Sequence, residues 1–214
     1  MSTSFTILLI STASIAFFHT ILGPDHYLPF IGMAKANNWP KRKLFSLTAV
    51  CGINHIFISV LIALIGIWSG KQLSQIELLN SIRGEMAAWI LIGIGILYTL
   101  WGIKYASRKI HHRHMDVSKF SKQSAWALIL FFLLGPCEPL IPLLMVSGLQ
   151  FDYLGIFLII SVFIFVTIAT MVTIVYIGIN GLNHFNLKPI EPYFHLIAGS
   201  IIIASGLSIQ FLGL

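Results

Sequence analysis

Ionisable residues inside apolar stretches are the part of this sequence best suited to chemistry. Asp25 and Glu138 lie in such stretches, whereas the remaining carboxylates fall in loops or at helix ends. His19, His26 and His55 have equally apolar surroundings. A carboxylate in the middle of a membrane is costly unless it is paired, protonated or solvated, so these residues are functional candidates by default. The alternative is a structural brace between a carboxylate and a neighbouring histidine.

Together with a cysteine, these residues form a donor set for a transition metal. Imidazole, carboxylate and thiolate groups suit nickel, cobalt, zinc, copper or iron(II), and they suit magnesium or calcium poorly. The same groups could relay protons, because histidine titrates near neutral pH. A metal carrier could need both properties, because protonation of the ligands opposes metal binding. The predicted metal ligands are His19, Asp25, His26, His55, Cys137 and Glu138.

Glycine and proline residues interrupt the helices that position these ligands. The motif that begins with Gly23 recurs 112 positions later at Gly135, with leucine before and proline after the glycine in both cases. Proline lacks an N–H and clashes with the preceding helical turn. Paired broken helices at matching places in two halves point to a central binding site; the alternative is that they only kink the helices for packing. The predicted break residues are Gly23, Pro24, Gly135, Pro136 and Pro139.

The elements that must position the motifs are membrane-spanning helices. The chain has 214 residues, of which 57% are hydrophobic and 9% are charged, against about 25% charged in soluble domains. A spanning helix needs about 20 mostly apolar residues. Six stretches qualify: 5–34, 45–69, 86–105, 124–148, 154–179 and 193–213.

Three spans in each half imply that the halves face opposite ways. We therefore predict an all-α integral membrane protein with six transmembrane helices in two inverted three-helix repeats. The first repeat would span residues 1–110, and the second would span residues 123–214. A cytoplasmic linker that contains histidine and lysine, residues 111–122, would join them.

The net charge of +6 comes from an uneven distribution of basic residues among the connections. Lys71 and Arg83 follow the second span, and the other eleven follow the first, third and fifth spans. This asymmetry is typical of the positive-inside rule. It predicts a protein of the cell (inner) membrane, with cytoplasmic basic loops and both termini outside, and it argues against nucleic acid as a partner.

Other polar residues received weaker interpretations. The loop residues His111, His112 and His114 could bind metal weakly, but neighbouring basic residues would repel a cation, and a solvated loop that sets the topology is the alternative. Thr170 is a candidate pore-lining residue. We assign no role to His184 and His195.

The segment from His19 to Leu28 reads H-x3-G-x-D-H-x-L. This pattern resembles the first-helix signature of the hydrogenase/urease accessory permeases, the HupE/UreJ group. It is also similar to the H-x4-D-H signature of the nickel/cobalt permeases, with one extra residue before the aspartate. These families and the related urease-accessory transmembrane proteins carry Ni(II) or Co(II). The resemblance implies that His19, Asp25 and His26 are metal ligands.

The second motif departs from that pattern. The segment from Gly135 to Pro139 lacks the acidic second motif of nickel/cobalt permeases, and it looks more like the Pro-Cys helices of the DsbD/CcdA-type thiol–disulfide carriers. Those carriers have a comparable three-plus-three plan but need a cysteine in each half. Asp25 stands at the equivalent first-half position, which tells against dithiol electron transfer.

The sequence thus predicts a transporter of divalent transition-metal ions, nickel or cobalt first, and not an enzyme. Zinc, copper and iron are further candidate cargoes. The alternatives are an electron carrier that uses Cys51 and Cys137, a transporter of another small solute, and a metal-dependent membrane hydrolase. The expected partners are the lipid bilayer and the metal ion, with a second copy or a metallochaperone as further candidates.

Overall fold

The fold is built from helices. The computed structural model describes residues 3–68, 73–110, 117–135, 137, 139–150, 153–185 and 187–212, and these ranges contain no strand. Two elements are short 3-10 helices, here called η1 and η2. The elements in chain order are α1 (Thr3–Leu22), η1 (Pro24–His26), α2 (Leu28–Ala36), α3 (Lys41–Trp68), α4 (Leu73–Ile110), α5 (Val117–Leu134), α6 (Leu140–Gln150), α7 (Tyr153–Asn183), η2 (Lys188–Tyr193) and α8 (Phe194–Leu212).

Within the described residues, five segments are long and apolar enough to cross a membrane. Between 22% and 39% of the residues in each window are buried inside the protein, and the rest are at least partly exposed, where lipid is the suitable solvent for apolar side chains. The prediction of helices alone is confirmed for the described residues, and the five candidate spans agree with the predicted multi-pass membrane protein. The five segments are Phe5–Leu22, Lys41–Gly66, Gly84–Ser107, Tyr153–Asn183 and Pro189–Phe211.

The predicted span 124–148 is not among these five, because it is divided between two helices. α5 begins within a polar, lysine-containing segment and ends at Leu134, and α6 has only 11 residues. Six spans therefore stays a prediction. The predicted linker 111–122 is also shorter than expected, because α5 begins at Val117; its residues 111–116 lie outside the described part of the chain.

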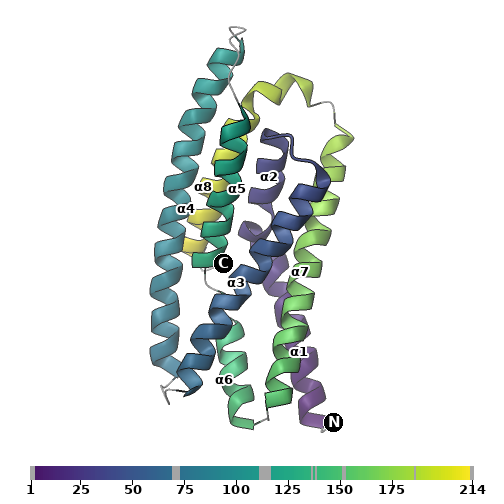
Figure 1. Ribbon diagram of the computed structural model, residues 1–214, viewed down its shortest axis with the longest axis vertical. Coiled ribbons are helices and arrows are strands. Elements are labelled where there is room, and N and C mark those ends of the chain that lie inside the picture. The colour runs from purple at the N-terminus through teal and green to yellow at the C-terminus, as the bar shows by residue number, and fades with distance from the viewer. Residues whose placement is uncertain are drawn as a thin grey trace.

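Both predicted helix breaks are present, and the helices around them run in opposite directions. Figure 1 shows α1 and α2 following one another upward, whereas α5 and α6 follow one another downward. α3, α4 and α7 run past both breaks, and α8 packs along the upper part of α4. The breaks thus lie at mid-height, where long helices from elsewhere in the chain can reach them.

The helix ends divide between the two ends of the bundle. In Figure 1 the end of α2, the start of α3, the end of α4, the start of α5, the end of α7 and η2 lie at the upper end, here called the basic end. The starts of α1, α4 and α7 and the ends of α3 and α6 lie at the opposite end. At the basic end, Lys35 and Lys41 donate hydrogen bonds to Asn183 (2.7 Å) and Asn180 (2.8 Å). These bonds hold the end of α7 to the connection between α2 and α3.

The buried apolar residues form two separate clusters. The first, here called the basic-end core, joins α2, the start of α3, α4, α5, the end of α7 and α8; its members include Phe30, Met33, Cys51, Phe131 and Phe132. The second, here called the opposite core, joins α1, the later part of α3, α6 and the start of α7; its members include Ile56, Cys137, Leu140, Leu144 and Phe163. The two helix breaks lie between these cores in the chain.

Candidate metal site

The first helix break satisfies its own backbone groups. Pro24 ends α1 at Leu22, and residues Pro24–His26 form a single 3-10 turn before α2 begins. The Gly23 carbonyl accepts a hydrogen bond from the His26 N–H (3.1 Å), and the Ile21 carbonyl accepts one from the Tyr27 hydroxyl (3.2 Å). Carbonyls released by a broken helix must find such partners where no water is available. The break is therefore a built feature of the fold.

The same turn fixes the orientation of the His26 ring. His26 Nδ1 lies 3.2 Å from Asp25 Oδ1 and 3.2 Å from the Gly23 carbonyl oxygen. Both are acceptors when Asp25 is ionised, so a neutral His26 that donates to them carries its proton on Nδ1 and keeps the lone pair of Nε2. Histidines that bind metals commonly have their second nitrogen held in this way by a carboxylate or a carbonyl. Asp25 and His26 are only 6% and 1% exposed.

Gly23 is required here by the lack of space. A Cβ atom at this position would lie 2.5 Å from His26 Nδ1 and 2.9 Å from Asp25 Oδ1. The histidine ring folds back over the backbone of residue 23, and only glycine leaves room for it.

Three histidines from separate parts of the chain meet at this turn. One potential ligand nitrogen from each of His19, His26 and His55 lies within 4.8 Å of the other two. The ring centroids of His26 are 4.9 Å from those of His19 and 5.1 Å from those of His55. These three residues are here called the three-histidine cluster. His19 comes from the last turn of α1, His26 from η1, and His55 from the middle of α3.

The helix break, and not a continuous helix, places His19 and His26 together. α1 ends at Leu22, and Gly23 is extended (φ −85°, ψ 95°). The 3-10 turn, rather than helical periodicity, brings the two rings together. Local backbone geometry after a proline is not described by a helical repeat.

The cluster has the chemistry of a cation site. Among the described residues, the buried Nε2 atoms of His19 and His26 have no hydrogen-bond partner. A buried polar atom without a partner is uncommon and calls for an explanation such as an ion or water. Neutral imidazole suits zinc, copper, iron and nickel. The residues present therefore fit a divalent transition-metal ion.

Residues at and just before the second helix break lie against this cluster. A Cβ atom at Gly135 would lie 3.5 Å from His55 Nδ1. One turn earlier in α5, the Phe132 ring lies 5.8 Å from His55 and 6.3 Å from His26, measured between centroids. The sequence analysis missed Phe132. Its position one helical turn before the Gly-Pro break was the available signal.

Cys137 and Asp25 are not members of the three-histidine cluster. Cys137 is fully buried in the opposite core, and its N–H donates to Ser59 Oγ at 3.1 Å. Ser59 follows His55 by one turn of α3, so the break is attached to the helix that carries the third histidine. Asp25 contacts the cluster through His26. The predicted ligand Glu138 and the predicted break residue Pro136 lie outside the described residues.

The two cysteines belong to different parts of the interior. Cys51 is a member of the basic-end core, and Cys137 is a member of the opposite core. Along α3, His55 lies between Cys51, which belongs to the basic-end core, and Ile56, which belongs to the opposite core. The three-histidine cluster therefore lies between the two cores on this helix. The structure therefore offers no observation that favours electron transfer between these thiols.

A layer of small polar residues accompanies the cluster. On α7, Thr167 and Thr170 fall between the members of the two cores, and they are 0% and 8% exposed. The hydroxyl of Thr167 has no hydrogen-bond partner among the described residues. Thr20 on α1 is fully buried and donates to the Ala16 carbonyl. A polar layer thus separates the two apolar cores.

His195 shows a different use of a buried histidine. It lies in the first turn of α8 and is 2% exposed. Its Nδ1 is 2.9 Å from the Tyr98 hydroxyl oxygen. The rings of Trp101 and Tyr105 each lie 4.6 Å from its ring. Asn37 donates to the same tyrosine hydroxyl at 3.0 Å. Aromatic packing and a neutral hydrogen bond explain this histidine without a metal.

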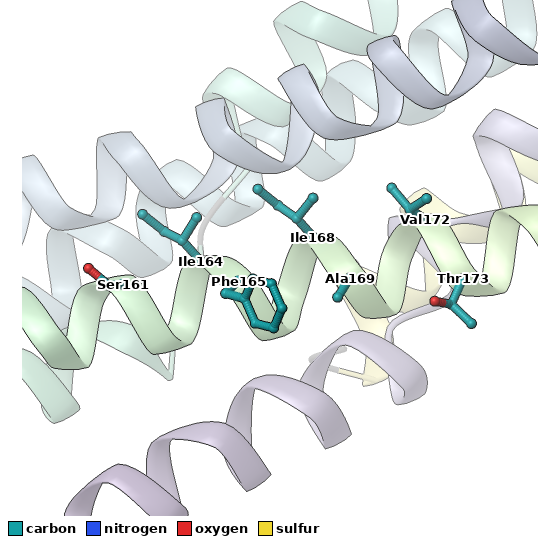
Figure 2. Close-up of a pocket in the computed structure, with 7 residues that line it drawn as sticks. All are labelled: Ser161, Ile164, Phe165, Ile168, Ala169, Val172 and Thr173. Atoms are coloured by element: carbon teal, nitrogen blue, oxygen red, sulfur yellow. The ribbon is translucent and has the colours of Figure 1, made fainter.

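An apolar groove along α7 offers no competing metal site. Figure 2 shows its lining, which Ser161, Ile164, Phe165, Ile168, Ala169, Val172 and Thr173 form on one helix, with a cavity volume of about 590 Å³. The lining contains no histidine, cysteine or carboxylate, and Ser161 already donates to the Phe157 carbonyl. The loop residues His111, His112 and His114 lie outside the described part of the chain.

Comparison with known proteins leaves the chain without a match: no family model, no curated protein and no solved structure matches it. Its class is therefore defined by fold and site alone. The chain is an all-helical, multi-pass membrane protein with a cluster of three histidines at a break in its first helix.

Proposed function

We propose that this protein transports divalent transition-metal ions across a membrane and binds them at the three-histidine cluster. The observation that carries the proposal is the convergence of His19, His26 and His55 within 4.8 Å in the interior of the bundle. A histidine that only joins two helices needs one hydrogen-bond partner on the neighbouring helix, and it is more stable when its polar ring atoms are all hydrogen-bonded. Three imidazoles that face one another are suited to share a cation instead.

Asp25 supports this function in two ways. Its carboxylate lies 3.2 Å from His26 Nδ1 and can accept a hydrogen bond from it, which would leave Nε2 as the ligand atom. Its negative charge also offsets part of the charge of a dehydrated dication, which three neutral imidazoles cannot do. We assign Asp25 to positioning and charge compensation beside the metal, with the three imidazoles as direct ligands.

The arrangement of the helices supports alternating access between inverted repeats. The α1–α2 pair and the α5–α6 pair run in opposite directions, and each is broken at a Gly-Pro pair near mid-height (Figure 1). If α5 and α6 together make the fourth crossing, the protein has six spans in two three-helix halves. Transporters of this design rock one half against the other around a fixed central site.

The charge distribution supports one orientation. Eleven of the 13 lysine and arginine residues belong to connections whose flanking helix ends lie at the basic end in Figure 1. The positive-inside rule assigns that end to the cytoplasm of a bacterial-type inner membrane. The N-terminus, at the opposite end, would then lie outside, and we assign the C-terminus to the same side.

Nickel and cobalt remain the first candidates for the cargo. This choice comes from the resemblance of the His19–Leu28 segment to the nickel/cobalt permease signature. The donor set by itself also accommodates zinc, copper and iron(II).

The test is metal flux into proteoliposomes, measured for nickel, cobalt, zinc, copper, iron(II) and manganese. We expect saturable flux of one or two ions in wild type and its loss in His26→Ala. His195→Ala is the matched control, because it removes a histidine that is equally buried but packed among aromatic rings. Calorimetry on the purified proteins should show the same ordering for metal affinity.

Undiminished metal affinity in a folded His26→Ala variant would remove the central claim. Equal losses in His26→Ala and His195→Ala would mean that the cluster acts only through stability. Binding without flux would make the protein a metal sensor or store rather than a carrier.

A further inference from the structure

The three-histidine cluster lies between the two apolar cores along α3. Cys51, one turn before His55, belongs to the basic-end core, and Ile56 belongs to the opposite core. His26 and His55 are 1% and 3% exposed, whereas His19 is partly exposed. The rings of His26 and His55, which face the basic-end core through Phe132, therefore form the more buried side of the cluster.

One residue of the basic-end core touches the cluster from the second half of the chain. Phe132 is 1% exposed, and its ring lies beside both His26 and His55. On its other side it packs against Phe30 (5.1 Å between centroids) and Phe131 (5.1 Å). Phe132 is thus the link between the metal-binding rings and the apolar layer towards the basic end.

The position of Phe132 at the end of a broken helix would let it move. It lies in the last turn of α5, three residues before Gly135, whose backbone faces His55. A displacement of α5 relative to α3 would withdraw the ring and the Gly135 backbone from the cluster together. An aromatic ring in a narrow passage excludes a hydrated cation, because the ion would have to lose water beside an apolar surface.

We propose that Phe132 is the gate that closes the three-histidine cluster towards the basic end, and that movement of α5 opens it. This inference rests on the proposed metal site. A gate changes how fast an ion reaches and leaves the site, whereas the ligands determine how tightly it is held. The two roles are therefore separable in one experiment.

The experiment measures the rates of Ni(II), Co(II) and Zn(II) association and dissociation with the purified full chain by stopped flow. For Phe132→Ala we expect both rates to rise about tenfold or more with little change in Kd, since a tenfold change needs only about 1.4 kcal/mol of barrier. Phe131→Ala is the matched control. Phe131 is similarly buried and packs on Phe132, but among the described residues it makes no ring contact with a histidine.

Phe132→Leu keeps apolar bulk and serves where the alanine variant does not fold; we expect a smaller acceleration in the same direction. Unchanged rates in a folded Phe132 variant would overturn the gate and leave the metal site standing. The same acceleration in Phe131→Ala would overturn it too, because loosening of the core would then be the cause. Absence of any metal binding by wild type would overturn the proposed function and the gate together.

Discussion

The two helix breaks have the same Gly-Pro sequence but different tasks. The first is closed within itself: His26, Asp25 and Gly23 bond to one another, and the turn presents two of the three histidines. The second is attached to another helix through Ser59, and it brings a glycine backbone and a phenylalanine ring to the cluster. The comparison indicates a division of labour, in which one half supplies ligands and the other covers them.

The matched glycines give the strongest test of this division. We expect Gly23→Ala to lower metal affinity by about 100-fold, the upper range for changes that disturb ligand orientation, because a Cβ there would displace the His26 ring. Gly135→Ala should have a much smaller effect, since its Cβ would lie 3.3 Å from the Phe131 carbonyl oxygen and 3.5 Å from His55 Nδ1, so only a small shift is needed. Calorimetric titration of both variants measures the difference. Equal losses would show that the two breaks are equivalent.

A change at Asp25 distinguishes a positioning residue from a direct ligand. We expect Asp25→Asn to weaken metal binding about tenfold, because the amide oxygen can still accept the His26 Nδ1 hydrogen bond while the charge is lost. X-ray absorption on the loaded variant should show an unchanged number of nitrogen ligands. A loss as large as that of His26→Ala, with one light-atom ligand fewer, would make Asp25 a ligand itself.

Ser59→Ala tests the attachment of the second break. Removing the acceptor of the Cys137 N–H leaves a buried donor without its partner, which costs about 1–3 kcal/mol of stability. Metal affinity should stay near that of wild type, because the hydroxyl is not part of the cluster. Thermal or denaturant unfolding measures the first quantity, and calorimetry measures the second. A large affinity loss without destabilisation would place Ser59 in the site.

The smallest effect is expected for Cys51→Ser. Cys51 is buried in the basic-end core and is not a member of the three-histidine cluster, and a serine in a helix can bond to the carbonyl of the preceding turn. Metal flux should therefore remain close to that of wild type. A severe loss of flux in a folded Cys51→Ser protein would return attention to thiol chemistry between Cys51 and Cys137.

Much of the first motif could be predicted from the sequence, because its geometry is local. Pro24 must end the helix, Gly23 must leave space, and Asp25 must lie next to His26 in any conformation of the turn. His55 was predicted as a ligand only from its polarity inside an apolar stretch. Whether α3 crosses the first break at that residue depends on packing between helices that are far apart in sequence, so spacing alone could not establish it.

The second motif shows where sequence reasoning reached its limit. Cys137 has the right chemistry for a ligand, yet it lies in the opposite core, while Phe132, which has no ligand chemistry, lies against two histidines. Cys137 is held there by the hydrogen bond from its N–H to Ser59 of α3. Such a contact joins residues 78 positions apart in the chain, and no local periodic pattern predicts it.

The sequence by itself determined the helical, membrane-embedded class, the locations of the two breaks and the presence of imidazoles near the first. These properties follow from hydropathy and from the covalent limits of proline and glycine, which act within a few residues. Only the tertiary structure decided that His19, His26 and His55 share one cluster and that Phe132 covers it. Such a site requires side chains from four elements, α1, η1, α3 and α5, to meet, and that depends on how the helices pack over their whole length.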